Sequence, residues 1–250
     1  MKKIVNYDEA LVTYLDMLGF RELVQSDTAG RISRTIRLVR DALRPDRDRA
    51  RLYEMTYQSF SDLTVVSIPV LTAANLNFRP GVLHSQILRV ANAQVELLRE
   101  GIVLRGGMTF GSIVRSYGQL FGPALIRAYD LESTQAKHPR VILDEVIFRE
   151  LKRNPALTKS GAEHEQRAIM ALLDKDEDDH WFIDYLCALH SEVESRKFRG
   201  FLRRHRQIIR TRLRQFAQEK KVVEKYEWLA EYHNRTIEKL DVRRANAVLI

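Results

Sequence analysis

The sequence has one cysteine in 250 residues, and this scarcity excludes two kinds of architecture. A single cysteine cannot form an intrachain disulfide, and it cannot build a structural zinc site from several thiolates. Cys187 lies in an apolar run over residues 181–189, so we interpret it as a small buried side chain. Redox or metal chemistry at this thiol is therefore not expected.

Long hydrophobic runs are also missing. No stretch approaches the ~18 uncharged apolar residues that a membrane-spanning helix needs. Residues 1–8 reach a carboxylate before an apolar segment develops, which differs from a secretory signal peptide. We therefore expect a cytoplasmic protein that does not insert into membranes.

Negative charge is the scarcer sign. Lys and Arg total 41 against 33 for Asp and Glu, which gives a formal net charge of +8. Such a surplus suits nucleic acid, an anionic membrane or a polyanionic small ligand such as a nucleoside triphosphate. Basic residues crowd the segment 196–214, with apolar residues interleaved. A helix that binds RNA or DNA is one interpretation; we favour a packing or dimerisation helix, so nucleic acid is not the expected partner.

The hydrophobic content of 45% and the charged content of 30% indicate a folded globular chain. Apolar alternation and periodicity predict the order β-α-ββ-α-ββ-α-β over the first 150 residues. The strands are expected at residues 10–16, 51–59, 63–68, 102–110, 112–117 and 141–143. Hairpins among helices are typical of an α+β sandwich with a mixed or antiparallel sheet. We expect residues 1–150 to form this domain and residues 151–250 to form a mainly helical extension.

Two carboxylates, Asp16 and Asp62, stand where predicted strands meet turns. Strand-end acids with apolar neighbours are costly to desolvate unless cations neutralise them. If the two strands are neighbours, Asp16 and Asp62 could share a pair of divalent ions, which would activate a hydroxyl and stabilise a phosphoryl group. Each aspartate alone also fits a turn former or a helix cap.

Two glycine-containing segments add to this pattern. Arg105 precedes the glycine pair at 106–107 inside a predicted strand. A glycine pair lets a ligand or another backbone approach closely, and an arginine can hold phosphate oxygens with two parallel hydrogen bonds. The segment 117–132 is a glycine-bounded turn that leads into a helix, whose N-terminal dipole favours a phosphate. Each segment by itself also fits an ordinary bend or loop.

The order and spacing of these motifs resemble the catalytic domain of class III nucleotidyl cyclases. The matching segments are residues 15–20, 60–62, 105–111 and 121–132, within a region of about residues 8–150.

The resemblance to these cyclases assigns a role to each matching residue. It implies that Asp16 and Asp62 bind two divalent ions, Mn²⁺ or Mg²⁺, and that the backbone carbonyl of Met17 is a further ligand. It implies that Arg105 holds the triphosphate. It also implies a head-to-tail homodimer with composite active sites, in which Asp16 and Asp62 face residues 118–130 of the partner.

Several positions depart from the pattern of purine cyclases. Gln58 stands where purine cyclases place a Lys or Glu that reads the base, and Gln119 falls near the second base-reading position. The asparagine and arginine that steady the ribose and the transition state correspond to Ile126 and Asp130. Arg127 is a candidate substitute, since it adjoins the first of these positions.

A cyclase without purine-reading residues and with a helical tail resembles the pyrimidine cyclases of Pycsar anti-phage defence. The resemblance implies that the ribose 3′-hydroxyl of UTP attacks the α-phosphorus, giving cyclic UMP and pyrophosphate. The product would signal to a cyclic-nucleotide-binding effector. The carboxamide of Gln58 both donates and accepts, so it suits a uracil or cytosine edge. Tyr57 and Phe20 are further substrate-binding candidates, and core packing fits Tyr57 equally well. Cyclic CMP production, and nucleotide or nucleic-acid binding without turnover, are the alternatives.

Overall fold

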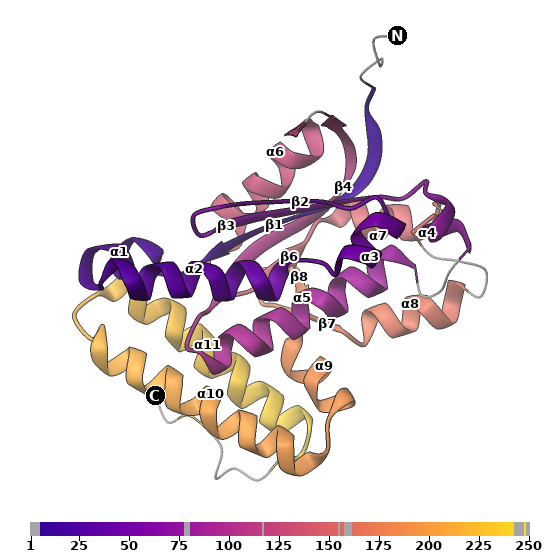
Figure 1. Cartoon of the computed structure of the whole chain (residues 1–250). Coiled ribbons are helices and arrows are strands. Elements are labelled where there is room, and N and C mark those ends of the chain that lie inside the picture. The colour runs from indigo at the N-terminus through magenta and orange to yellow at the C-terminus, as the bar shows by residue number, and fades with distance from the viewer. Residues whose placement is uncertain are drawn as a thin grey trace.

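A mixed sheet of eight strands forms the centre of the molecule (Figure 1). The computed structural model describes residues 6–77, 81–116, 118–154, 156–157, 162–242 and 248. In spatial order the strands are β2 (Thr56–Phe60), β3 (Leu63–Pro69), β1 (Asp8–Met17), β4 (Leu104–Ser116), β6 (Val141–Leu143), β8 (Trp181–Ile183) and β7 (Leu173–Lys175), with β5 (Gln119–Phe121) paired to β4. Strands β4 and β6 are parallel and the other pairs are antiparallel.

Helices lie on both faces of this sheet. They are α1 (Phe20–Ser26), α2 (Ala29–Leu43), α3 (Arg47–Leu52), α4 (Ala73–Asn77), α5 (Val82–Arg99), α6 (Pro123–Asp130), α7 (Glu145–Leu151), α8 (Ala162–Met170), α9 (Tyr185–Glu192), α10 (Ser195–Gln215) and α11 (Lys220–Lys239). A π-helix, η1 (Leu131–Gln135), continues α6. Figure 1 shows α6 on one face of the sheet, with α2, α5 and the tail helices α9–α11 on the other. The expected α+β architecture is therefore present.

Strand β1 contributes to two separate cores because its side chains alternate between the faces of the sheet. Leu11 and Leu15 belong to the larger core, which α2, α5 and the tail helices share. Ala10 and Val12 belong to a smaller core under α6. The same alternation directs Asp16 toward the α6 face.

The glycine pair in β4 is explained by close packing of neighbouring segments. A Cβ on Gly106 would lie 2.5 Å from the carbonyl oxygen of Tyr14 in β1. A Cβ on Gly107 would lie 2.5 Å from Cβ of Leu131 and 2.7 Å from the carbonyl oxygen of Ala128. All three distances are too short for real atoms, so β1 and the α6–η1 segment can approach β4 this closely only because these two positions lack side chains.

The strand predicted at residues 51–59 is wrong in its first half, where the chain forms α3 before β2 begins. The cause is a cap at Asp46. Its Oδ1 accepts hydrogen bonds from the backbone N–H of Asp48, at 2.9 Å, and of Arg49, at 3.2 Å. An aspartate in this position satisfies free N–H groups of the first turn and favours helix over strand.

The two strands predicted at residues 102–110 and 112–117 are one strand, β4, which runs through Gly111. The hairpin turn comes later, at Gly118, whose φ of 77° is readily adopted by glycine, and β5 is its second arm. Tyr117 and Pro80, expected at the end of a strand and the start of a helix, lie outside the described residues.

The second part of the chain completes the sheet as well as adding helices. Strands β7 and β8 lie at one edge, where Phe182 pairs with Ile142 of β6. The larger core includes side chains from α9, α10 and α11. The helical extension is therefore present, while a domain division near residue 150 stays a prediction. In the part of the chain that the structure describes, no helix has the length and apolar character needed to cross a membrane.

Candidate active site

An ion pair between neighbouring strands forms the centre of the candidate site. Asp16, near the end of β1, pairs directly with Arg105 in the antiparallel register of β1 and β4. Nη2 of Arg105 lies 3.2 Å from Oδ2 of Asp16 and 2.5 Å from Oε1 of Glu132 in η1. Directly opposite residues bring their side chains together, so the sheet register itself creates this contact.

Asp62 lies in the turn between β2 and β3, on the other side of β1. Leu15 of β1 pairs with Thr64 of β3, which places this turn beside the end of β1 that carries Asp16. Ser61 has a φ of 58°, in the left-handed region, so the chain reverses sharply just before Asp62. The fold thus brings Asp16, Asp62 and Arg105 to the same end of three neighbouring strands.

Several carboxylates lie close together in this half-buried site. Burial, and then the charges of Glu132 and Asp62, raise the pKa of Asp16 to about 7, although Arg105 acts in the opposite direction. Burial, and then the charges of Glu132 and Asp16, raise the pKa of Tyr14 to about 12. Burial also raises the pKa of Glu132, despite its ion pair with Arg105. One arginine therefore does not neutralise this group of carboxylates.

These residues fit a divalent cation by charge and by donor type. Hard cations such as Mg²⁺ and Mn²⁺ take carboxylate and carbonyl oxygens. Burial, and then the charges of Glu132 and Asp62, disfavour the ionised form of Asp16, and a divalent cation would favour it. Among the described residues no group of three His, Cys, Asp or Glu side chains is arranged to hold an ion. A metal here would therefore need other oxygen ligands besides Asp16 and Asp62, such as the Met17 carbonyl and phosphate oxygens.

The two candidate base-reading residues lie at one turn of the chain. Nε2 of Gln58, on the edge strand β2, donates a hydrogen bond to the carbonyl oxygen of Gly118 at 2.8 Å. Gln119, the residue after Gly118, begins β5 and is exposed. Residues far apart in the sequence thus form one polar surface, with amide groups available to solvent.

The other residues predicted to bind substrate or metal make contacts with the rest of the protein. The Tyr57 hydroxyl donates to the carbonyl oxygen of Arg40 in α2, at 3.0 Å, and the ring packs against the larger core. Phe20 begins α1 and also packs against that core. The Met17 side chain is buried, so its backbone is the part that remains for binding. For Tyr57 the contacts fit the core-packing interpretation.

Arg127 is held by Asp144 in this chain. Its Nε and Nη2 donate to the two carboxylate oxygens of Asp144, at 2.8 and 2.9 Å, and the Thr109 hydroxyl donates to the same carboxylate at 2.7 Å. Burial raises the pKa of Asp144, but the hydrogen bonds from Arg127 and Thr109 outweigh it and the pKa is lowered. Two parallel hydrogen bonds give this pair a fixed geometry.

We expect Arg127→Gln to lower the free energy of unfolding by about 1–2 kcal/mol, because Asp144 is buried while Arg127 is partly exposed. Urea denaturation followed by circular dichroism measures this change. Arg37→Gln, at an exposed position of α2, is the matched control and should leave stability within about 0.5 kcal/mol. Equal stability of both variants would contradict a structural role for the Arg127–Asp144 pair.

Two residues of the site were missed in the sequence. Glu132 closes the 121–132 motif, and its proximity to Arg105 depends on the turn that η1 makes against β4. Lys225, on α11, is close enough to the site for the charged groups of the site to affect its pKa. Burial and then the charge of Arg105 lower the Lys225 pKa, while the charges of Glu22, Asp16 and Glu132 act in the opposite direction. The helical pattern of α11 carries no signal for this placement, because it depends on packing of the tail against the sheet.

No protein-family model and no curated protein matches this sequence. Solved structures do match. The adenylyl cyclase CyaB from P. aeruginosa has a TM-score of 0.50 and 13% identity, and the match covers 72% of this chain and 96% of that chain. The monomeric guanylyl cyclase domain of the RhoGC fusion protein from the aquatic fungus Blastocladiella emersonii has a TM-score of 0.44 and 13% identity, with the same coverage.

The fold is that of a class III nucleotidyl cyclase catalytic domain. At 13% identity to CyaB the likeness is one of fold. The cyclase-like α+β sandwich expected from the motifs is confirmed, together with the helices that follow it. In this fold Asp16 lies near the end of β1 opposite Arg105 of β4, and Asp62 lies in the turn between β2 and β3.

Proposed function

We propose that this chain is a nucleotidyl cyclase that converts UTP into 3′,5′-cyclic UMP and pyrophosphate. One observation carries the proposal: on a cyclase fold, Asp16 lies opposite Arg105 at the end of the central strands, with Asp62 in the adjoining turn. Carboxylates beside an arginine are the groups that a triphosphate with its divalent ions requires. A role in anti-phage signalling, through a cyclic-nucleotide-binding effector in the cytoplasm, belongs to the same proposal.

The residues of this chain position the triphosphate and balance its charge. Both ion pairs of Arg105 use Nη2, so the guanidinium retains other N–H donors for phosphate oxygens. Lys225 adds a second positive charge beside the same carboxylates. Asp16 and Asp62, with the Met17 carbonyl, would hold two divalent ions, Mn²⁺ or Mg²⁺, which when bound would supply positive charge to acidify the ribose 3′-hydroxyl and to stabilise the departing pyrophosphate.

A head-to-tail homodimer supplies the other half of each site. Large apolar side chains are exposed near the Asp62 turn and on α6. Phe60, which is 81% exposed, lies two residues before Asp62, and Ile126 and Tyr129 lie on the outer side of α6. Exposed aromatic and aliphatic side chains of this size favour a protein interface. Docking of α6 and β5 from one protomer on the Asp62 turn of the other covers them and joins the metal residues to Gln58 and Gln119.

The proposal is tested by incubating the purified protein with Mn²⁺ and each of the four ribonucleoside triphosphates. Chromatography with mass spectrometry identifies the products. We expect cyclic UMP and an equal amount of pyrophosphate from UTP. Cyclic CMP from CTP would replace the uridine assignment and leave the cyclase assignment intact. Binding of a triphosphate without any cyclic product would overturn the enzyme assignment and favour a nucleotide-binding protein. Ile126 and Asp130 motivate this alternative, because they stand at the positions of the asparagine and arginine of purine cyclases.

We expect Gln58→Ala to lower kcat/KM for UTP about 10- to 100-fold, because a base edge would lose a hydrogen-bonding partner in a partly desolvated place. Steady-state kinetics with UTP and CTP measure the loss for each base. Gln207→Ala, at an exposed position of α10, is the matched control. An unchanged kcat/KM in Gln58→Ala would remove this residue from base recognition.

A further inference from the structure

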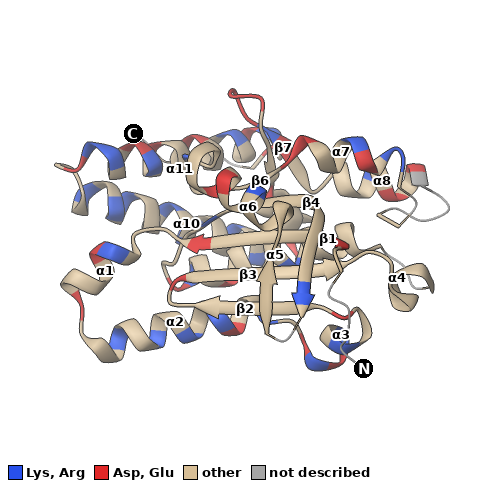
Figure 2. Ribbon diagram, turned by 90° about the horizontal axis from the view of Figure 1, so that it is seen from above, with Lys and Arg blue, Asp and Glu red and all other residues tan. Residues whose placement is uncertain are grey.

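Helix α10 carries a concentration of positive charge that the proposed reaction does not use. Its sequence, Ser195–Gln215, contains no Asp or Glu. The basic residues are Arg196, Lys197, Arg199, Arg203, Arg204, Arg206, Arg210, Arg212 and Arg214. The apolar side of the helix is buried against the larger core, through Phe198, Leu202 and Ile209 among others. This helix is thus a fixed part of the fold with a basic outer side, and its Lys and Arg positions are coloured blue along α10 in Figure 2.

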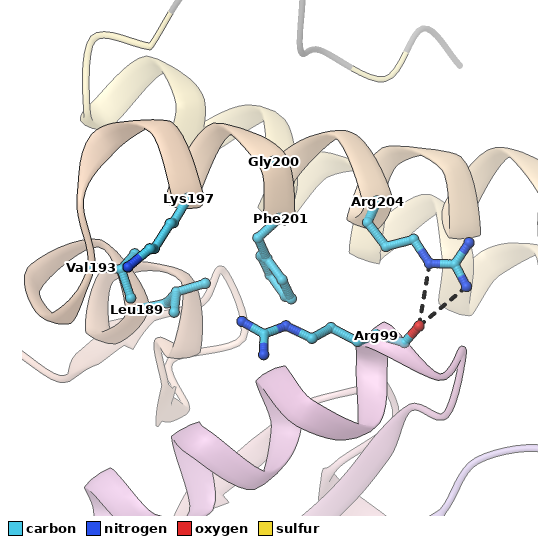
Figure 3. A pocket seen from close by; sticks show the side chains of 7 residues that line it. All are labelled: Arg99, Leu189, Val193, Lys197, Gly200, Phe201 and Arg204. Atoms are coloured by element: carbon cyan, nitrogen blue, oxygen red, sulfur yellow. Dashed lines mark hydrogen bonds between the residues drawn. The ribbon is translucent and has the colours of Figure 1, made fainter.

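A hollow of about 340 Å³ lies beside the first turns of this helix, between α10, α9 and the end of α5 (Figure 3). Its apolar wall consists of Leu189, Val193 and Phe201. Its cationic side chains are Arg99, Lys197 and Arg204. The volume lies within the range of small-molecule sites in proteins, which are mostly apolar with a few placed polar groups.

Two of the cations around the hollow, Arg99 and Arg204, are held in place without being neutralised. Nε and Nη2 of Arg204 donate to the backbone carbonyl oxygen of Arg99, at 3.2 and 3.1 Å, which attaches α10 to the end of α5. Figure 3 shows the Arg99 side chain extending beneath Phe201, and its guanidinium carbon lies 5.8 Å from the centre of that ring. In the described part of the chain, no carboxylate forms an ion pair with Arg99, Lys197 or Arg204.

Gly200 keeps one wall of the hollow open. A Cβ at this position would have Nη2 of Arg203 as its nearest neighbour, at 3.8 Å, so neither packing nor a positive φ requires glycine here. Glycine inside a helix costs about 1 kcal/mol relative to alanine. Glycine here leaves space at the wall of the hollow that a larger side chain would occupy.

We propose that this hollow binds a small amphipathic anion, a molecule with an apolar body and one carboxylate or phosphate group. The body packs against Leu189, Val193 and Phe201, and the anionic group meets Arg99 and Lys197. An anion beside the Arg99 guanidinium, which lies over the Phe201 ring, gains a charge-assisted hydrogen bond. The site lies apart from Asp16 and Asp62 and is independent of the cyclase reaction.

Isothermal titration calorimetry of the full-length protein tests the proposal with octyl phosphate, and with inorganic phosphate and octanol as the two halves of the probe. Octyl phosphate is expected to bind, and each half at least about tenfold more weakly, since each keeps only one of the two interactions. A co-sedimentation assay with anionic phospholipid vesicles distinguishes a membrane lipid from a free metabolite as the source of this chemistry. Binding of phosphate as tight as that of octyl phosphate would overturn the apolar half of the proposal.

Single-residue variants test whether octyl phosphate binds in this hollow. Gly200→Leu fills the hollow and should abolish octyl phosphate binding, while Gly200→Ala should retain it. Arg99→Gln keeps the backbone carbonyl that Arg204 uses and should weaken binding about tenfold. Arg210→Gln removes an equal charge from the same helix at an exposed position outside the hollow, and should change binding less than about twofold. No binding by the wild type, or equal weakening in Arg99→Gln and Arg210→Gln, would overturn the site. Circular dichroism confirms that each variant is folded.

Discussion

Asp62→Asn is expected to lower cyclase turnover with UTP by at least about 10³-fold while the protein stays folded. Asparagine has nearly the same shape as aspartate, so the β2–β3 turn is preserved and the change is one of charge. The charge matters because Asp62 and Asp16 are the acidic groups that the site offers to divalent ions, and an amide is a far weaker ligand for a hard cation. Cyclic UMP formation at saturating Mn²⁺ measures the effect.

Asp41→Asn is the matched control for Asp62→Asn, since Asp41 is exposed on α2 and its contact is with neighbouring Arg40. It should retain wild-type turnover. Size-exclusion chromatography should give the same elution for both variants and the wild type. Wild-type turnover in Asp62→Asn would remove Asp62 from the metal site and, with it, the main support for the proposed reaction.

Mixing two defective variants tests whether the active site is shared between protomers. Asp62→Asn lacks a metal residue and Gln58→Ala lacks a base-reading residue. In a two-fold dimer with composite sites, half of the randomly mixed dimers carry one intact site, so about a quarter of wild-type activity is expected to return. Activity no higher than the average of the two variants would contradict the composite arrangement, while leaving the assignment of Asp62 unaffected.

Arg140→Met is expected to lower the free energy of unfolding by about 3–5 kcal/mol, the largest stability effect that the structure predicts. Arg140 is 1% exposed and its guanidinium donates to the carboxylates of Asp176 and Asp178. The guanidinium carbon also lies 5.7 Å from the Trp228 ring centre, and Trp228 Nε1 donates to Asp176 at 2.6 Å. Removing the arginine leaves buried negative charge without its main partner. Urea denaturation measures the loss.

Lys175→Met provides the control for Arg140→Met. Lys175 pairs with Asp179 in the same β7–β8 connection, but the Asp179 side chain is 88% exposed, so water already solvates this pair. No measurable change in the denaturation midpoint is expected. An equally small effect of Arg140→Met would show that the buried network does not stabilise the fold.

The same network predicts how stability depends on pH. Burial raises the pKa of Asp178, but the hydrogen bonds and charge of Arg140 hold it down to about 2. An ordinary aspartate has a pKa near 3.9, so the folded state binds fewer protons than the unfolded state in this range. This contribution is present above about pH 4 and is lost as the pH falls toward 2. In Arg140→Met the loss of stability over this range should be smaller, which denaturation curves between pH 5 and 2 will show.

The acidic segment 174–179 illustrates what a sequence leaves open. Its charges are visible in the sequence, which favours a solvated loop over a metal site. In the structure, Asp176 and Asp178 bind Arg140, a residue more than 30 positions away. That contact depends on β8 pairing with β6, and strand pairing across long connections is decided by the packing of the whole sheet and not by local pattern.

The sequence by itself predicted most of the elements and the α+β class of the fold. Local periodicity and turn chemistry were enough to predict an α+β fold, and the resemblance of the motifs to class III cyclases predicted which α+β fold it is. Tertiary structure decided which side chains meet: Arg105 with Asp16 and Glu132, Gln58 with Gly118, and Arg127 with Asp144. It also turned the basic segment 196–214 into a packed helix with a hollow at its side. Register, burial and tail packing set these contacts, and each depends on residues far apart in the chain.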